Sequence, residues 1–132
     1  MEEQILPGSI ELIVPANHGM MLVVRMTAAG ALAWGGMTLD AVDDLKMAAE
    51  EACTCLMMQP RPCTHLHLVF QRSLTATELT VTGAGRSTES EKPQEPYEMD
   101  VIRCILESMV DTVCMESDEY GLTSIKMTKA IS

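Results

Sequence analysis

The sequence is poor in basic and aromatic residues. It contains 9 Lys and Arg against 19 Asp and Glu, which gives a formal net charge of −10 at pH 7. Nucleic acids and anionic membranes are bound by clustered Lys and Arg, so this balance argues against both classes of partner. Only one Phe, one Trp and two Tyr accompany twelve Met, and we expect the Met side chains to fill the core.

Long apolar runs are also missing. The longest, residues 20–24, stops at Arg25, whereas a membrane span needs about 18 apolar residues. The N-terminus is acidic where a secretion signal would be basic. The five cysteines are an odd number, so we expect reduced thiols in a cytoplasmic protein and no disulfide framework.

The residues that are present suffice for one folded domain over residues 1–132. The chain is 47% hydrophobic, which excludes wholesale disorder. Asn17 and Thr38 can each cap a following helix, and period-two alternation predicts strands elsewhere. The predicted strands are residues 9–14, 65–71, 77–82, 113–117 and 123–128. The predicted helices are residues 18–34, a second helix that Thr38 caps and the proline-containing segment 59–62 ends, and residues 99–110. The second helix has one apolar stripe, formed by Val42, Leu45, Ala49, Ala52 and Leu56.

This order predicts an α+β fold, a two-layer α/β sandwich. Three helices would cover one face of a mixed, mostly antiparallel sheet. Residues 83–97 are rich in Gly, Ser, Pro and charge, so we expect a mobile surface loop that could act as a lid.

Glu51 and Cys55 lie four residues apart on the second predicted helix and therefore share one face. They could form a carboxylate base beside a ligand position that faces a pocket. The alternative is a solvated carboxylate and a buried thiol, and residue types alone favour this second interpretation.

Cysteine and histidine are also spaced as in some metal sites. Cys53 and Cys55 are two apart on a helix and point in different directions, whereas Cys63, His65 and His67 could share a strand face. Ligands on an open face without supporting hydrogen bonds make poor sites, so we predict no metal site. A pocket for a soft metal or another small molecule, using Cys53, Cys55 and Cys63, stays as an alternative.

Gly83 and Gly85 follow a predicted strand. They could let the backbone approach a phosphate, but no helix or Lys follows at once, and a turn is the favoured interpretation. No Ser-His-Asp or Cys-His-Asp arrangement stands out.

Four strings in order resemble the anti-sigma factor serine-protein kinases, small members of the GHKL superfamily with a histidine-kinase-like ATPase fold. They cover nearly the whole chain, and the second, with its Asp-Leu-Lys and Glu-Ala, is the most specific. They are SIELIVPA (9–16), LDAVDDLKMAAEEACTCL (39–56), HLHLVFQRSLTATELTVTGAGR (65–86) and ESMVDTVCMESDEYGLTSIKMTK (107–129).

The resemblance implies an ATP site with Mg²⁺ between the helices and the long loop. Carried over by position, Glu51 matches the general base and Thr123 matches a threonine beside the adenine. Cys55 stands where the family has the Asn that holds Mg²⁺. Gly83 stands where the family has the Asp of an Asp-x-Gly-x-Gly motif, which binds the adenine amine. Of this motif only Gly85 is kept.

Two further departures concern the phosphates. Residues 96–106 contain no glycine, although the family covers the phosphates with a glycine motif there. Glu98 and Asp100 add negative charge at the same place.

Our first hypothesis is therefore a regulatory protein without ATP or Mg²⁺. It would contact a sigma factor, an anti-anti-sigma protein or a second copy of itself as a homodimer. The second hypothesis is an active ATP-dependent serine-protein kinase that uses Glu51 as base.

Overall fold

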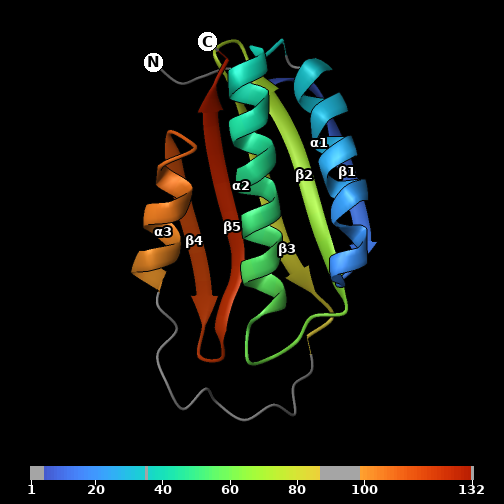
Figure 1. Cartoon of the computed structure of the whole chain (residues 1–132), viewed down its shortest axis with the longest axis vertical. Helices are drawn as coiled ribbons and strands as arrows, with labels where there is room; N and C mark the ends of the chain where they lie inside the picture. Colours follow the sequence, from blue (N-terminus) through green and yellow to red (C-terminus); the bar gives the residue numbers. More distant parts are fainter. Residues whose placement is uncertain (1–4, 35, 87–98, 132) are drawn as a thin grey trace.

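Three helices cover one face of a five-stranded sheet (Figure 1). The computed structural model describes residues 5–34, 36–86 and 99–131. This arrangement confirms the predicted two-layer α+β fold. Its elements are β1 (Ile5–Pro15), η1 (His18–Met20), α1 (Met21–Trp34), α2 (Leu39–Met57), β2 (His65–Ser73), β3 (Ala76–Ala84), α3 (Met99–Glu107), β4 (Thr112–Asp118) and β5 (Gly121–Ala130).

The sheet has the strand order β1-β2-β3-β5-β4. All four of its described strand pairs are antiparallel, so no parallel pair of the expected mixed sheet is found among the described residues. Two of the pairs, β2–β3 and β4–β5, are hairpins, which can only be antiparallel. β1 and β4 lie at the two edges of the sheet.

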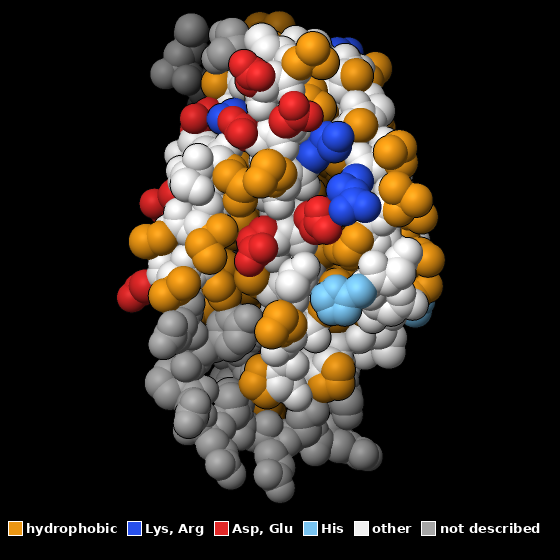
Figure 2. All heavy atoms as spheres, in the orientation of Figure 1, with side chains coloured by type: hydrophobic (Ala, Val, Ile, Leu, Met, Phe, Trp, Pro, Cys, Tyr) orange, Lys and Arg blue, Asp and Glu red, His pale blue; other side chains and the backbone are white. Residues whose placement is uncertain are grey.

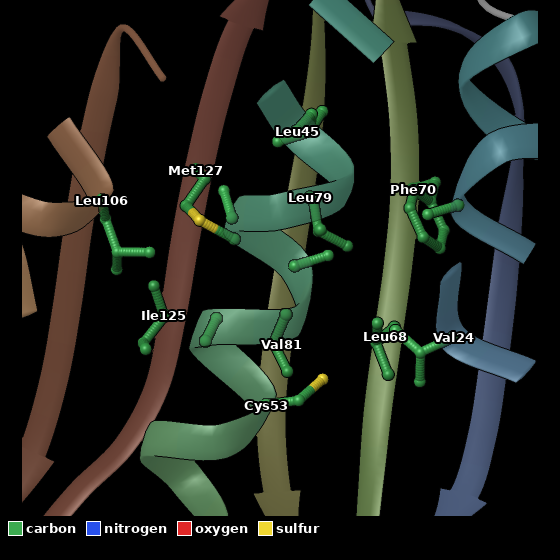
Figure 3. Packing of buried hydrophobic residues seen from close by; sticks show 14 of the residues in the cluster. Val24, Leu45, Cys53, Leu68, Phe70, Leu79, Val81, Leu106, Ile125 and Met127 are labelled. Atoms are coloured by element: carbon green, nitrogen blue, oxygen red, sulfur yellow. The ribbon is translucent and has the colours of Figure 1, made fainter. Parts of the chain in front are cut away.

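Alternating side chains of β2 point to opposite faces of the sheet, as predicted. Leu66, Leu68 and Phe70 are buried under the helices, whereas His65 is exposed and His67 is half-buried on the other face. Figure 3 shows Leu68 and Phe70 beside Val24 of α1, and Leu79 and Val81 of β3 beneath α2. The core therefore lies between one face of the sheet and the helix layer.

The second helix begins as the sequence predicts. Thr38 is its N-cap, and Thr38 Oγ1 accepts a hydrogen bond from the Ala41 amide at 3.2 Å. The predicted apolar stripe faces the sheet, and Ala48, Ala49 and Ala52 within the helix are completely buried. These small side chains let the α2 backbone pack closely on the strands.

Several predicted boundaries are wrong; β1, for example, begins at Ile5 and not at residue 9. Gly83 and Ala84 belong to β3 and not to a loop, because they pair with Leu66 and His65 of β2. Gly85 and Arg86 follow β3 outside any strand, and residues 87–97 of the expected mobile loop lie outside the described residues. α3 ends at Glu107 and not at residue 110, because the chain turns there to enter β4 and the Asp111 amide bonds to the Thr128 carbonyl at 2.9 Å.

No helix within the described ranges is long and apolar enough to cross a membrane. The longest of them, α2, carries acidic residues along its length.

Gly85 should be intolerant of any side chain. Its φ is +72°, and an added Cβ would collide with Thr64 Oγ1. We expect Gly85→Ala to lower the free energy of unfolding by about 2–4 kcal/mol in chemical denaturation. Gly30→Ala is the matched control, because Gly30 is helical with open space around it, and should raise stability by about 0.5–1 kcal/mol. Equal effects of the two substitutions would contradict the described turn.

Candidate functional site

Glu51 and Cys55 lie one turn apart on α2, as their spacing predicts. Cys55 is buried with 4% of its surface exposed, and Glu51 is half-buried. The Cys55 thiol donates a hydrogen bond to Glu51 Oε1 over 3.8 Å. The two residues thus form a pair in which the carboxylate is the acceptor.

Burial and, to a smaller extent, the negative charge of Glu51 together raise the pKa of the Cys55 thiol to about 12. Cys55 is therefore a neutral S–H group at neutral pH. Metals bind the thiolate and not the thiol, so this group is a poor metal ligand. Burial likewise raises the pKa of Cys53 to about 12, with added contributions from Cys63 and Glu50.

The C-terminal end of α2 is held by a buried glutamine. Gln59 Nε2 donates to the Cys55 carbonyl at 2.9 Å, and Gln59 Oε1 accepts from the Leu122 amide of β5 at 2.8 Å. Only 4% of Gln59 is exposed. This side chain satisfies a carbonyl at the helix end and ties α2 to the β4–β5 hairpin.

Arg86 lies over Gly83 at the end of β3. Its Nη2 is 2.5 Å from the point where a Cβ at Gly83 would be. Arg86 Nη1 donates to the Arg61 carbonyl at 2.6 Å, and Nη2 donates to the Leu56 carbonyl at 3.4 Å. The guanidinium thus fills the space above a residue that has no side chain and neutralises part of the negative end of α2.

Arg61 and the β4–β5 turn complete this end of the molecule. The Arg61 guanidinium is 3.8 Å from Asp118 Oδ2 and lies 4.2 Å from the centre of the Tyr120 ring. Thr123 of β5 follows this turn and is half-buried. Its Oγ1 donates a hydrogen bond to the Glu116 carbonyl of β4 at 3.1 Å. The Thr123 hydroxyl proton is therefore already used within the hairpin.

The other cysteine and histidine candidates are separated. Cys63 is buried, whereas His65 and His67 lie on the outer face of the sheet. His67 Nε2 is 3.1 Å from Glu11 Oε1 on that face. Among the described residues no three His, Cys, Asp or Glu side chains are grouped closely enough to hold a metal. The hypothesis of a shared strand face for Cys63, His65 and His67 is therefore wrong.

Two surface hollows are found away from these residues. One, of about 310 Å³, is lined by Arg25, Asp43, Lys46, Met47 and Glu50 between α1 and α2. The other, of about 300 Å³, lies at the start of α2 beside Asp111 and Lys129. None of the five predicted site residues lines either hollow.

The chain is similar to serine-protein kinases over about a third of its length. It is 44% identical over 48 residues to the serine-protein kinase RsbW of Halalkalibacterium halodurans, a segment that covers 36% of this chain and 30% of that protein. It is 42% identical over 45 residues to RsbW of Bacillus subtilis, which covers 34% and 28%. RsbW of Bacillus velezensis gives the same identity and coverage. No family model matches the chain.

The similarity to RsbW supports the resemblance to anti-sigma kinases for that part of the chain. The aligned segments span under a third of each RsbW kinase, so they do not by themselves establish what the whole chain does.

Sequence reasoning missed three side chains at this site. Gln59 and Arg61 stood in a proline-containing segment that we interpreted only as a helix stop. Arg86 was part of an expected loop. One feature of the sequence could have predicted the position of Arg86. Gly83 has no side chain, and Arg86 follows three residues later with a side chain long enough to fill the space above it.

The buried thiols should react slowly with alkylating reagents. Cys104 and Cys114 are exposed, whereas Cys53 and Cys55 are buried and have raised pKa values. Iodoacetamide on the native protein at neutral pH, followed by peptide mass spectrometry, should label Cys104 and Cys114 first. In denaturant all five cysteines should react at similar rates. Labelling of Cys55 as fast as Cys104 in the native protein would contradict the description of the site.

Proposed function

We propose that this protein is an anti-sigma-type regulator that acts by protein contact and has lost productive ATP binding. On this proposal its partner is a sigma factor or an anti-anti-sigma protein. The similarity to RsbW supports the kinship. The observation that carries the loss is the Arg86 guanidinium lying over Gly83.

Adenine recognition is the first function affected. The resemblance implies a carboxylate at position 83 that accepts a hydrogen bond from the adenine amine. Here that position has no side chain, and the space above it holds Arg86, which can donate hydrogen bonds but cannot accept them. Two donors cannot pair, so the arginine replaces an attractive contact with an unfavourable one.

Magnesium binding is the second. Mg²⁺ prefers oxygen ligands, and the position of the expected Asn amide holds the Cys55 thiol. This thiol keeps its proton and donates a hydrogen bond to Glu51. The carboxylate proposed as a base is thus paired with a neighbour that cannot hold the metal.

Phosphate binding is the third. Residues 96–106 lack the glycines that would bring backbone amides to a triphosphate. Asp100, in the first turn of α3, is exposed and adds a negative charge. Glu98 lies outside the described residues. These losses affect adenine recognition, magnesium binding and phosphate binding separately. They support the proposal that the domain keeps its fold but does not bind ATP.

Calorimetry with Mg-ATP and Mg-ADP tests the loss. Titration into this protein should give no heat beyond that of dilution. The residues that would hold the metal, accept the adenine amine and cover the phosphates are all replaced. Bacillus subtilis RsbW, titrated in the same buffer, is the positive control. A dissociation constant in the micromolar range would contradict the proposal.

A kinase that uses Glu51 as base is the second candidate. Two observations favour it: Glu51 is half-buried on α2 where the resemblance puts the base, and the similar proteins are serine-protein kinases. The substrate of this alternative would be a serine of a partner protein, with ATP and Mg²⁺ as cofactors.

The two candidates differ in a phosphate-transfer assay. On our proposal the wild-type protein transfers no phosphate from γ-labelled ATP to an anti-anti-sigma protein. On the alternative the wild-type protein transfers phosphate, and the Glu51→Gln variant does not. Glu50→Gln is the control, because Glu50 is a neighbouring carboxylate that bonds to Arg25, and this variant should still transfer phosphate. Transfer that depends on Glu51 but not on Glu50 would establish the alternative in place of our proposal.

A further inference from the structure

The two edges of the sheet differ in how well they are protected against pairing with another strand. β1 contains Pro7 and Gly8, has an irregular register between Ile5 and Ser9, and ends at Pro15. Proline has no N–H to donate and an irregularity bends the strand, so β1 is a poor template for a further strand. β4 contains no Pro or Gly, and none of its residues is buried. Such an open edge is a template for strand addition.

Two hydrogen bonds identify the backbone groups of β4 that face outward. The Val113 carbonyl accepts from Arg103 Nη1 of α3 at 2.9 Å, so it points away from β5. The Glu116 carbonyl accepts from Thr123 Oγ1 of β5 at 3.1 Å, so it points toward β5. Successive residues of a strand alternate between these two directions, and the register of β4 is regular up to Glu116. The N–H and C=O of Met115 therefore both face outward, where no described strand pairs with them.

Arg103 covers this edge only in part. Its guanidinium also lies 3.7 Å from Glu107 Oε1, one turn further along α3, and its side chain is 42% exposed. A contact this exposed contributes little to stability and can be exchanged for a hydrogen bond from an added strand. Arg103 thus competes for the Val113 carbonyl but does not reach the outward groups of Met115.

The side chains of β4 define which strand would fit beside it. Val113 and Met115 are half-buried and pack against the core on the helix side of the sheet. Cys114 and Glu116 alternate with them and are exposed on the other side. Directly opposed side chains of neighbouring strands lie on the same face and contact each other. An added strand would therefore carry apolar side chains on the helix side and polar ones on the other side.

The charge around β4 determines the sign of those polar side chains. Between Arg103 and Lys126 the sequence contains five acidic residues and no basic one. Figure 2 shows acidic and hydrophobic side chains next to one another on the side of the molecule that α3 forms. A second copy of the chain is a poor occupant, because pairing two β4 edges would bring the two Glu116 carboxylates onto neighbouring strands of like charge. A strand with Lys or Arg on that face fits.

We propose that β4 is a docking edge for a partner protein, which adds an extended segment of alternating apolar and basic residues to the sheet. The backbone of this segment bonds to the N–H and C=O of Met115. Its apolar side chains lie beside Val113 and Met115, and its basic side chains lie near Glu116. Arg103 leaves the Val113 carbonyl when the segment binds. This inference goes beyond the proposed function, because it assigns a separate surface and holds whether or not the domain binds a nucleotide.

Fluorescence anisotropy with a labelled synthetic peptide tests the proposal. The probe is Lys-Val-Lys-Val-Lys-Val-Lys, and the control is Lys-Lys-Lys-Lys-Val-Val-Val, which has the same composition and charge without the alternation. The salt concentration is about 150 mM, at which charges more than about 8 Å apart are largely screened. The probe should bind saturably, and the control should bind about tenfold more weakly. Equal affinity of the two peptides, or no binding of the probe, would overturn the proposal.

Three variants, checked for folding by circular dichroism, locate the binding on β4. Glu116→Lys should weaken it about five- to tenfold, because a repulsion replaces an attraction. Asp43→Lys is the matched control: it changes the net charge equally on the exposed side of α2 and should leave the affinity unchanged. Arg103→Ala should bind about two- to tenfold more tightly, because it frees the Val113 carbonyl and removes a like charge. Equal losses for the two lysine variants, or no gain for Arg103→Ala, would contradict the assignment to this edge.

Amide hydrogen exchange distinguishes strand addition from a contact between side chains alone. Saturation with the probe should slow exchange of the Met115 amide by about tenfold, because this N–H faces outward and gains a partner. The Cys114 amide, which faces β5, should change far less. A Met115 amide that exchanges at the same rate with and without the probe would overturn the proposal.

Discussion

The packing of α2 across the middle of the sheet determines the positions of Glu51 and Cys55 and of the helix-end carbonyls that Gln59 and Arg86 bind. Leu45, Ala49 and Leu56 are completely buried along one side of this helix. That contact fixes the rotation of the helix, so Cys55 is turned inward and Glu51 is left half-buried beside it. It also places the last carbonyls of α2 within reach of Gln59 and Arg86.

Much of this arrangement can be predicted from local patterns. The period of two in residues 65–71, the stripe of α2 and the Thr38 cap all depend on near neighbours, and all are confirmed. The end of β3 and the positions of Gln59 and Arg86 could not be predicted in the same way. They depend on hydrogen bonds between residues up to 63 positions apart, such as that from the Leu122 amide to Gln59, which no local pattern encodes.

The same environment that stabilises the fold opposes the nucleotide chemistry that the resemblance implies. Burial keeps the Cys55 thiol neutral, and the thiol in turn bonds to the carboxylate that resembles a base. Arg86 bonds to two carbonyls at the end of α2 while its Nε has no hydrogen-bond partner among the described residues. The guanidinium therefore serves to close the structure at a place where the resemblance implies a ligand. On this account, the surfaces of the domain, and not a pocket, carry its function.

The central claim is that the protein binds its partner without a nucleotide. It is tested most directly by measuring the affinity of the purified protein for each sigma factor and anti-anti-sigma protein encoded in the same genome, with and without Mg-ATP. The account predicts that at least one of these proteins binds and that its dissociation constant is the same under both conditions. A complex that forms only when Mg-ATP is present would contradict it.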